Sequence, residues 1–171
     1  MYNNVEDILH KFRNMSFEIL KMMKFENTVQ DIAIDFHDIP YYGDKNSAGV
    51  RGMKPKNGTS WGRSFCTLDI IGKNKITLDV IDINGLCKNH SILIESLIER
   101  VGKIGVKIGT VFMDREFFNL DVTSELDNQK VDYIIAAKSN KRIKRMLEEH
   151  ERSMGNALQF LNDTIGKYIF A

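Results

Sequence analysis

The spacing of hydrophobic residues separates a helical start from a longer part in which strands and helices alternate. Over residues 1–29, apolar side chains recur every three or four positions, which is typical of an amphipathic helix. From Asp31 onward the period changes, and short apolar runs bounded by turn residues predict buried strands. These predicted strands cover residues 32–36, 65–71, 75–83, 106–113 and 131–137.

Helices are predicted between and after the later strands. One of them begins at Asn89 or Ser91, since either side chain suits an N-cap. A short helix is predicted over residues 122–129, and a basic helix runs from Ser139 to about His150. Helices and strands therefore alternate through the second half of the chain.

The remaining segments complete the predicted organisation. Residues 40–62 are rich in glycine and predict a long loop, a kind of segment that is often functional. Residues 167–171 resemble a strand cut short at the end of the sequence. We therefore divide the chain into an N-terminal helical segment (1–29), a core (30–150) and the start of an inserted or truncated C-terminal region (151–171).

The order of these elements predicts a mixed sheet. Three hairpin-connected strands form an antiparallel meander, in which the first and third strands run the same way. A right-handed helical crossover then delivers the strand at residues 106–113 parallel to them, beside either the third strand or the first. The sequence thus predicts an α/β fold, with further parallel strands beside the meander and helices on the sheet faces.

Composition narrows the class of protein. The 171 residues are 43% hydrophobic and 27% charged, as in a globular domain, and the net charge of +1 gives no sign of a globally basic protein. Cys66 and Cys87 form no CxxC pair, and no apolar run approaches the roughly 20 residues that span a bilayer. Because no signal peptide is evident, we expect a cytoplasmic protein without membrane contact. Walker A, GxGxxG, GxSxG and HExxH motifs are absent.

Two aspartates stand where predicted strands end, Asp35 and Asp114. If the fourth strand lies beside the first, both acids meet at one sheet edge, on chains about 4.8 Å apart. Two carboxylates at so short a distance repel each other unless a cation lies between them. Their hard oxygen atoms suit Mg²⁺ or Mn²⁺. On spacing alone, polar strand ends near turns are the favoured interpretation.

Three motifs in order carry a resemblance to a known family. The segments are IDFHDIPYYG from Ile34 to Gly43, FMDREFF from Phe112 to Phe118, and YIIAAKSNK from Tyr133 to Lys141. Together they resemble the DDE transposases of insertion sequences, in a branch common in archaeal genomes.

That resemblance implies a ribonuclease H-like fold, in which the fourth strand lies beside the first. It also implies that Asp35 and Asp114 are the first two catalytic and metal-binding acids, with Mg²⁺ or Mn²⁺ as cofactor. The implied partner is DNA, as transposon ends and target, and the assembly it allows is a homodimer. The implied function is metal-dependent DNA strand cleavage and transfer.

Other acids compete for these roles. Asp38 is the main competitor of Asp35, which we prefer because it ends the hydrophobic run. Asp82 holds a similar place on the third strand but matches no motif. Arg115 and Glu116 could orient Asp114 or a metal-bound water.

The third acid of the family is a Glu in a Tyr-x-x-Arg-x-x-x-Glu signature, which this sequence lacks. Glu148 or Glu149 could replace it, although that segment resembles an ordinary solvated helix face. We expect instead an element whose catalytic helix has been lost. Alternative functions are an inactive DNA-binding transposase remnant and a ribonuclease H-like nuclease.

Two basic clusters are candidate DNA contacts. One spans residues 45–63 and has aromatic side chains near its ends, which could follow phosphates and stack on an unpaired base. The other surrounds the predicted helix start at Ser139. Both could also be solvated surface. The residues we select as DNA-binding are Lys54, Lys56, Arg63, Lys138, Lys141 and Arg142.

Overall fold

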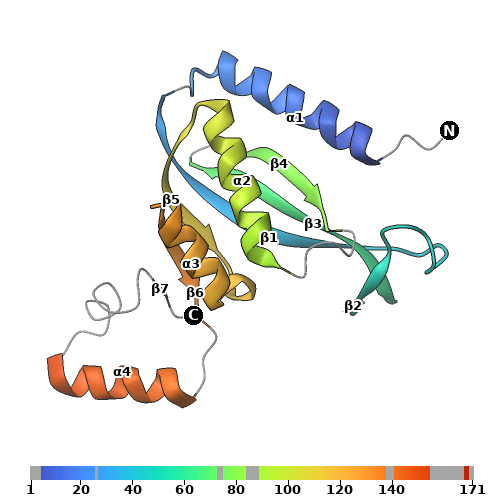
Figure 1. The fold of residues 1–171 in the computed structure, drawn as a ribbon. Coiled ribbons are helices and arrows are strands. Elements are labelled where there is room, and N and C mark those ends of the chain that lie inside the picture. The colour runs from blue at the N-terminus through green and yellow to red at the C-terminus, as the bar shows by residue number, and fades with distance from the viewer. Residues whose placement is uncertain are drawn as a thin grey trace.

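The computed structural model is a mixed β-sheet with helices on one face and along one edge (Figure 1). It describes residues 5–25, 27–72, 75–83, 89–137, 141–154 and 168–169. The helices are α1 (Val5–Met22), α2 (His90–Ile104), the 3-10 helix η1 (Arg115–Phe117), α3 (Leu120–Asn128) and α4 (Lys141–Met154). The strands are β1 (Val29–Pro40), β2 (Arg51–Lys56), β3 (Thr59–Ile71), β4 (Ile76–Asp82), β5 (Lys107–Met113), β6 (Asp132–Ala136) and β7 (Tyr168–Ile169).

The strand order places the crossover strand beside the first strand. Along the sheet the order is β2-β3-β1-β5-β6-β7, and β4 also pairs with β3. β1 and β3 are antiparallel, as are β3 and β4, whereas β5 runs parallel to β1 and β6 runs parallel to β5. The predicted meander with added parallel strands is therefore confirmed, and of the two positions open to the fourth strand it takes the one beside the first.

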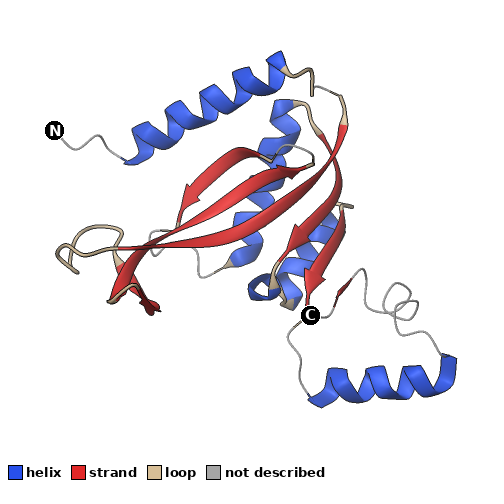
Figure 2. Cartoon of the chain, turned by 180° about the vertical axis from the view of Figure 1, so that it is seen from behind, coloured by secondary structure: helices blue, strands red, loops and turns tan. Residues whose placement is uncertain are grey.

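The core lies between one face of the sheet and helices α2 and α3. Asn89 caps α2 by accepting from the backbone N–H of Ser91, and Gly105 ends the helix in the left-handed region at φ 84°. The helix buries Leu93, Ile94, Leu97, Ile98 and Val101 against sheet residues that include Ile32, Ile34, Val111 and Met113. From behind, the strands stand in front of α2, and no described helix covers the middle of this second face (Figure 2).

Helix α1 covers the outer edge of the sheet at β4. Its Ser16 hydroxyl donates to the Thr77 carbonyl, and Arg13 donates to the Val80 carbonyl, so edge carbonyls of β4 are satisfied by side chains. Leu20 belongs to the same buried cluster as the sheet residues. The helix that we predicted over residues 1–29 is shorter, because β1 begins at Val29.

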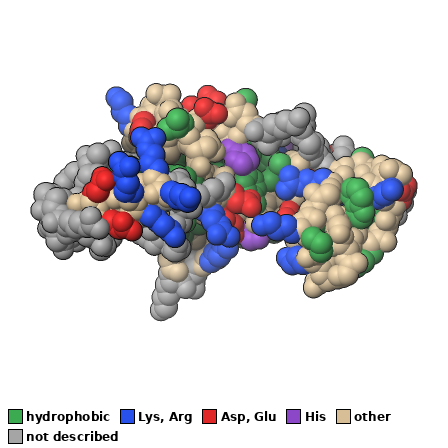
Figure 3. Space-filling view, turned by 90° about the horizontal axis from the view of Figure 1, so that it is seen from below, with side chains coloured by type: hydrophobic (Ala, Val, Ile, Leu, Met, Phe, Trp, Pro, Cys, Tyr) green, Lys and Arg blue, Asp and Glu red, His purple; other side chains and the backbone are tan. Residues whose placement is uncertain are grey.

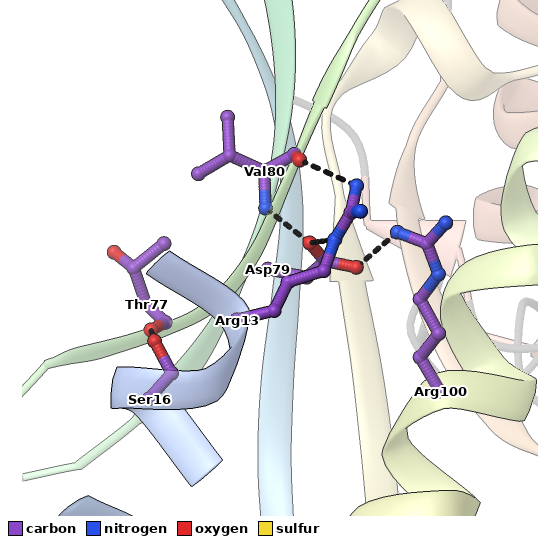
Figure 4. A network of polar contacts seen from close by, with 6 residues as sticks. All are labelled: Arg13, Ser16, Thr77, Asp79, Val80 and Arg100. Carbon is purple, nitrogen blue, oxygen red and sulfur yellow. Dashed lines mark hydrogen bonds and ion pairs between the residues drawn. The ribbon is translucent and has the colours of Figure 1, made fainter. Parts of the chain in front are cut away.

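A buried carboxylate holds α1, β4 and α2 together (Figure 4). Asp79 is 2% exposed, and its Oδ1 lies 2.7 Å from Arg13 Nε of α1. Its Oδ2 accepts from Arg100 of α2, and the backbone N–H of Val80 also donates to Oδ1. Both guanidinium groups are about one-third exposed, so the acid is desolvated more fully than its partners.

The segment predicted as a loop over residues 40–62 is largely a hairpin, and that prediction was wrong. β2 and β3 are joined by Asn57 and Gly58, both at positive φ (50° and 83°), which suits a two-residue hairpin turn. The Asn-Gly pair was a signal for this turn, but the nearby glycines and Pro55 hid the strand pattern. β1 is also longer than predicted, since its pairing with β3 continues to Pro40.

The later elements follow the predictions closely. α3, β5 and β6 lie within one or two residues of the expected bounds, and the short strand expected near the C-terminus is β7, paired parallel to β6. α4 continues to Met154, beyond the expected end at His150. Cys66 is fully buried, as a small apolar side chain would be, whereas Cys87, Lys138 and Ser139 lie outside the described residues.

No helix in the described part of the chain is both long and apolar enough to cross a membrane.

Replacing Asp79 with Ala is expected to lower the free energy of unfolding by about 3–5 kcal/mol, because Arg13 and Arg100 would keep their partly buried charges without the acid. Chemical denaturation of the two proteins measures the difference. Glu99→Ala is the matched control, since Glu99 forms an exposed pair with Lys103 and should cost less than about 1 kcal/mol. Equal losses for the two variants would contradict a structural role for Asp79.

Candidate active site

A bulge in the pairing of β1 with β5 determines which residues face each other at the end of the sheet. Gln30 pairs with Ile108, but Ile32 pairs with Val111, so β5 carries one extra residue in this interval. Asp31 Oδ1 accepts from the backbone N–H of Thr110, at 2.9 Å, inside the bulge. A side chain at Gly109 would place its Cβ 2.6 Å from that same oxygen, so glycine suits this position.

Beyond the bulge, the register brings Asp35 and Asp114 to neighbouring positions. The last parallel pair is Ile34 with Met113. Asp35 directly follows Ile34, and Asp114 directly follows Met113. Because Ile34 and Met113 are buried on the helix-covered face, alternation turns both aspartates toward the opposite, open face. Asp114 directly follows β5, whereas Asp35 stands inside β1, which continues to Pro40 against β3 alone.

Each aspartate has one oxygen held by a local backbone donor. Asp35 Oδ1 accepts from the N–H of Phe36 at 2.8 Å, and its side chain is 49% exposed. Asp114 is exposed and caps η1, with Oδ1 accepting from the N–H of Glu116 at 2.7 Å. The second oxygen of each carboxylate is left for other interactions, which in the case of Asp35 include His37 Nε2 at 3.7 Å.

Aromatic packing fixes the backbone next to both acids. Phe36, which follows Asp35, stacks on Phe117 of η1 with ring centroids 4.4 Å apart and planes 10° apart. Phe117 is fully buried, and His90 at the start of α2 lies tilted against both rings at 5.2 and 5.7 Å. The turn that carries Asp114 is thereby packed on the strand that carries Asp35.

The competing acids lie elsewhere. Asp38 is three residues from Asp35 and so projects to the other face, where it accepts from Ser64 and lies 3.4 Å from Arg51. Asp82 ends β4, and β3 lies between that strand and β1. Arg115 and Glu116 are both exposed within η1, beside Asp114 in sequence.

The described residues supply no third acid to this pair. No group of three or more His, Cys, Asp or Glu side chains with metal-binding proximity occurs among them. Glu149 of α4 pairs instead with Arg145 on its own helix at 2.9 Å. Figure 1 shows α4 beyond the end of the sheet, connected through segments that are not described.

The two aspartates fit a divalent cation by their chemistry. They are hard oxygen ligands on one face, and neither forms an ion pair with a Lys or Arg in the described part of the chain. Viewed from below, toward the ends of β5 and β6, acidic and histidine side chains lie near the middle of the molecule with Lys and Arg on both sides (Figure 3). Two carboxylates form a partial ligand set, which water molecules could complete.

The first basic cluster lies on the β2–β3 hairpin and the loop before it, which project from the body (Figure 1). Lys54 is exposed, Lys56 Nζ lies 3.3 Å from the Asp38 carbonyl, and Arg63 donates to the Ala48 carbonyl at 2.8 Å. Its aromatic side chains are not buried in the core: Tyr42 is 70% exposed and Trp61 40% exposed. β1 leads from Asp35 to this arm, because its last residue, Pro40, stands five residues or about 17 Å beyond Asp35 and directly before the loop.

The second basic cluster lies on α4, where an open hollow is lined by Lys141, Arg142, Arg145 and Met146. The three basic side chains are exposed. Lys138, the remaining residue predicted for this cluster, lies outside the described residues.

Comparisons with known proteins identify the family and the fold. The family model described as the transposase DDE domain matches residues 30–168. The chain belongs to this family. The structure of a piggyBac transposase synaptic complex with hairpin DNA matches with a TM-score of 0.52 and 14% sequence identity, covering 72% of this chain and 26% of that chain. No curated protein matches the sequence.

The fold of this transposase DDE domain is therefore ribonuclease H-like, as the resemblance implied. The domain spans about a quarter of the length of the piggyBac chain that it matches. Sequence reasoning missed three features of the site: the bulge at Asp31, the stack of Phe36 on Phe117, and a polar row that includes His37. Phe36 and Phe117 each stand in a motif that the sequence showed, but the contact between them, 81 residues apart, could not be inferred from either motif.

A double-mutant cycle tests the aromatic stack. Phe36→Leu and Phe117→Leu each retain an apolar side chain, and together they should show a coupling energy of about 0.5–1.5 kcal/mol, since either single variant already abolishes the ring stacking. Urea unfolding of the four proteins measures it. Phe65→Leu paired with Phe117→Leu is the control, with additive effects expected. Additivity for Phe36 and Phe117 would contradict the stack.

Proposed function

We propose that this transposase DDE domain binds Mg²⁺ or Mn²⁺ through Asp35 and Asp114 and acts on the phosphodiester backbone of DNA. The observation that carries the proposal is the β1–β5 register, which brings both acids to neighbouring positions on the open face of the sheet. Membership of the transposase family supports it.

Residues around Asp35 and Asp114 hold the two carboxylates in position before any cation binds. Backbone N–H groups hold one oxygen of each aspartate, and paired strands and the Phe36–Phe117 stack fix the backbone that carries them. When bound, divalent cations would activate water and stabilise charge on the phosphoryl group during in-line displacement. Strand cleavage of this kind leaves a 3′ hydroxyl that can attack target DNA without a covalent protein–DNA link.

The two basic clusters are proposed to hold DNA on either side of the acids. Lys54, Lys56 and Arg63 would contact phosphates from the hairpin arm, and Lys141 and Arg142 would do so from α4. The partners proposed are transposon ends and target DNA, and Lys138 stays a predicted DNA contact outside the described residues. A homodimer stays a prediction.

A DNA-binding remnant that performs no chemistry is the second candidate. It is favoured by one observation: the described residues bring no third acid to Asp35 and Asp114. This candidate keeps salt-sensitive DNA binding and lacks nicking activity.

Mn²⁺ titration by calorimetry tests the acid pair. Asp35→Asn and Asp114→Asn are each expected to remove measurable binding, because each deletes one of the two charges that hold the cation. The double variant should behave like either single one. Asp121→Asn, an exposed acid in the first turn of α3, is the control that keeps binding. Partial binding retained in both single variants would mean that the two acids do not share a cation.

Incubation with supercoiled plasmid and Mn²⁺ separates the two candidates. Nicking that disappears in Asp114→Asn supports the enzyme, whereas DNA binding without nicking supports the remnant.

Salt dependence of DNA binding tests the basic clusters. Replacing Lys54 and Lys56 with Gln, or Lys141 and Arg142 with Gln, should reduce the slope of log affinity against log salt by about 0.9 for each phosphate that the variant no longer neutralises. Fluorescence anisotropy of a labelled duplex across a salt series measures this slope. The control replaces Lys103 and Lys107, which lie at the opposite end of β5 from Asp114. If the control variant reduces the slope as much as the cluster variants do, the two clusters are not the specific site of DNA contact.

A further inference from the structure

A row of polar side chains crosses the open face of the sheet and ends at Asp35. It begins at Asp69 of β3, which is buried with 1% exposure. The Asp69 carboxylate accepts from the hydroxyls of Thr67, at 3.0 Å, and Thr77, at 2.5 Å. Lys75 Nζ lies 3.2 Å from Asp69 Oδ2 and compensates the buried charge. Both oxygens of the acid therefore act as acceptors.

Thr67 connects this buried acid to His37. The antiparallel register pairs Thr67 with Asp35, so the two side chains are neighbours on the same face, and His37 lies two residues further along β1 on that face. The hydroxyl oxygen of Thr67 is 3.2 Å from His37 Nε2. That same ring nitrogen is 3.7 Å from Asp35 Oδ2, the oxygen that no backbone N–H holds.

Counting protons fixes the direction of the row. A threonine hydroxyl has one proton, and Thr67 donates it to Asp69, because an ionised carboxylate can only accept. Toward His37 the Thr67 oxygen can then only accept, so His37 Nε2 must carry a proton. The neutral ring is thereby held as the Nε2–H tautomer, with its lone pair on Nδ1.

We propose that Asp69 and Thr67 are positioning residues, which fix the tautomer and orientation of His37 and, through the contact of its Nε2 with Oδ2 at 3.7 Å, limit the rotamers of the Asp35 carboxylate. The inference rests on the proposed function, since it takes Asp35 as a cation ligand. Outer residues of this kind hold the direct ligands of metal sites in place, and their loss typically lowers metal affinity roughly 10–100-fold. Nothing in the sequence pattern marks the row, because its members come from two strands that are far apart in the sequence.

The experiment compares Thr67→Val, Thr67→Ser and Thr77→Val. Thr77→Val is the matched control: it also removes one hydroxyl donor from buried Asp69, but Thr77 does not contact His37. Long-range ¹H–¹⁵N spectra of histidine-labelled protein, recorded where the rings are neutral, report the His37 tautomer, with His37→Gln assigning its signal. Mn²⁺ calorimetry and thermal unfolding are measured on the same samples.

The expected result is an Nε2–H tautomer in the unmodified protein, retained in Thr67→Ser and Thr77→Val and mixed in Thr67→Val. Mn²⁺ affinity should fall roughly 10–100-fold in Thr67→Val alone, while both valine variants lose similar thermal stability. An Nδ1–H tautomer in the unmodified protein, or equal effects of the two valine variants on tautomer and affinity, would overturn the proposal.

The tautomer measurement needs no metal, so the two failures can be told apart. Loss of the tautomer in Thr67→Val with no change in Mn²⁺ affinity refutes the link to Asp35 but leaves cation binding intact. Absence of Mn²⁺ binding in the unmodified protein refutes the proposed function of Asp35, and with it this role of the row.

Discussion

The extra residue of β5 beside Asp31 is the constraint on which the acid pair depends. Without it, the pairing that begins at Gln30 and Ile108 would continue unshifted and set Asp35 beside Met113 instead of Asp114. A shift of one residue also reverses the faces of every side chain that follows. The bulge therefore allows hydrophobic burial and acid alignment to be satisfied together, and the hydrogen bond from Thr110 to Asp31 stabilises it.

One face of the sheet carries the hydrophobic core, and the other carries the polar residues of the candidate site. On the helix-covered face, apolar residues of β1 and β5 pack against α2 and α3, and burial of this surface provides the main stabilisation. On the other face, β1 carries Asp35 and His37, and β3 carries Thr67. The stack of Phe36 on Phe117 links the core to the acids, because Phe36 follows Asp35 in β1 and Phe117 is the buried residue of η1, which Asp114 caps. Packing of these two rings therefore restricts the backbone next to both aspartates.

Hydrophobic periodicity was sufficient to predict the helices and the strands other than β2, because each depends on local alternation. It left two positions open for β5, and only the family resemblance placed that strand beside β1. The hairpin of β2 and β3 had a usable local signal in Asn57-Gly58, yet the flanking glycines and proline resembled a loop. The bulge and the row from Asp69 to His37 had none. Both arise from register between segments 30 to 79 residues apart, and register follows from packing that no single segment encodes.

Charge compensation distinguishes the acid pair from the other acids of the sheet. Asp79 is buried with two arginines, and Asp69 is buried with a lysine and two hydroxyl donors, as desolvated carboxylates require. Asp38 forms an ion pair with Arg51 on the face opposite Asp35. In the described part of the chain, Asp35 and Asp114 have no such basic partner, although each directly follows a residue of the last β1–β5 pair, Ile34 with Met113. Partial exposure makes this arrangement tolerable in water, and a cation between the carboxylates would convert their repulsion into binding energy.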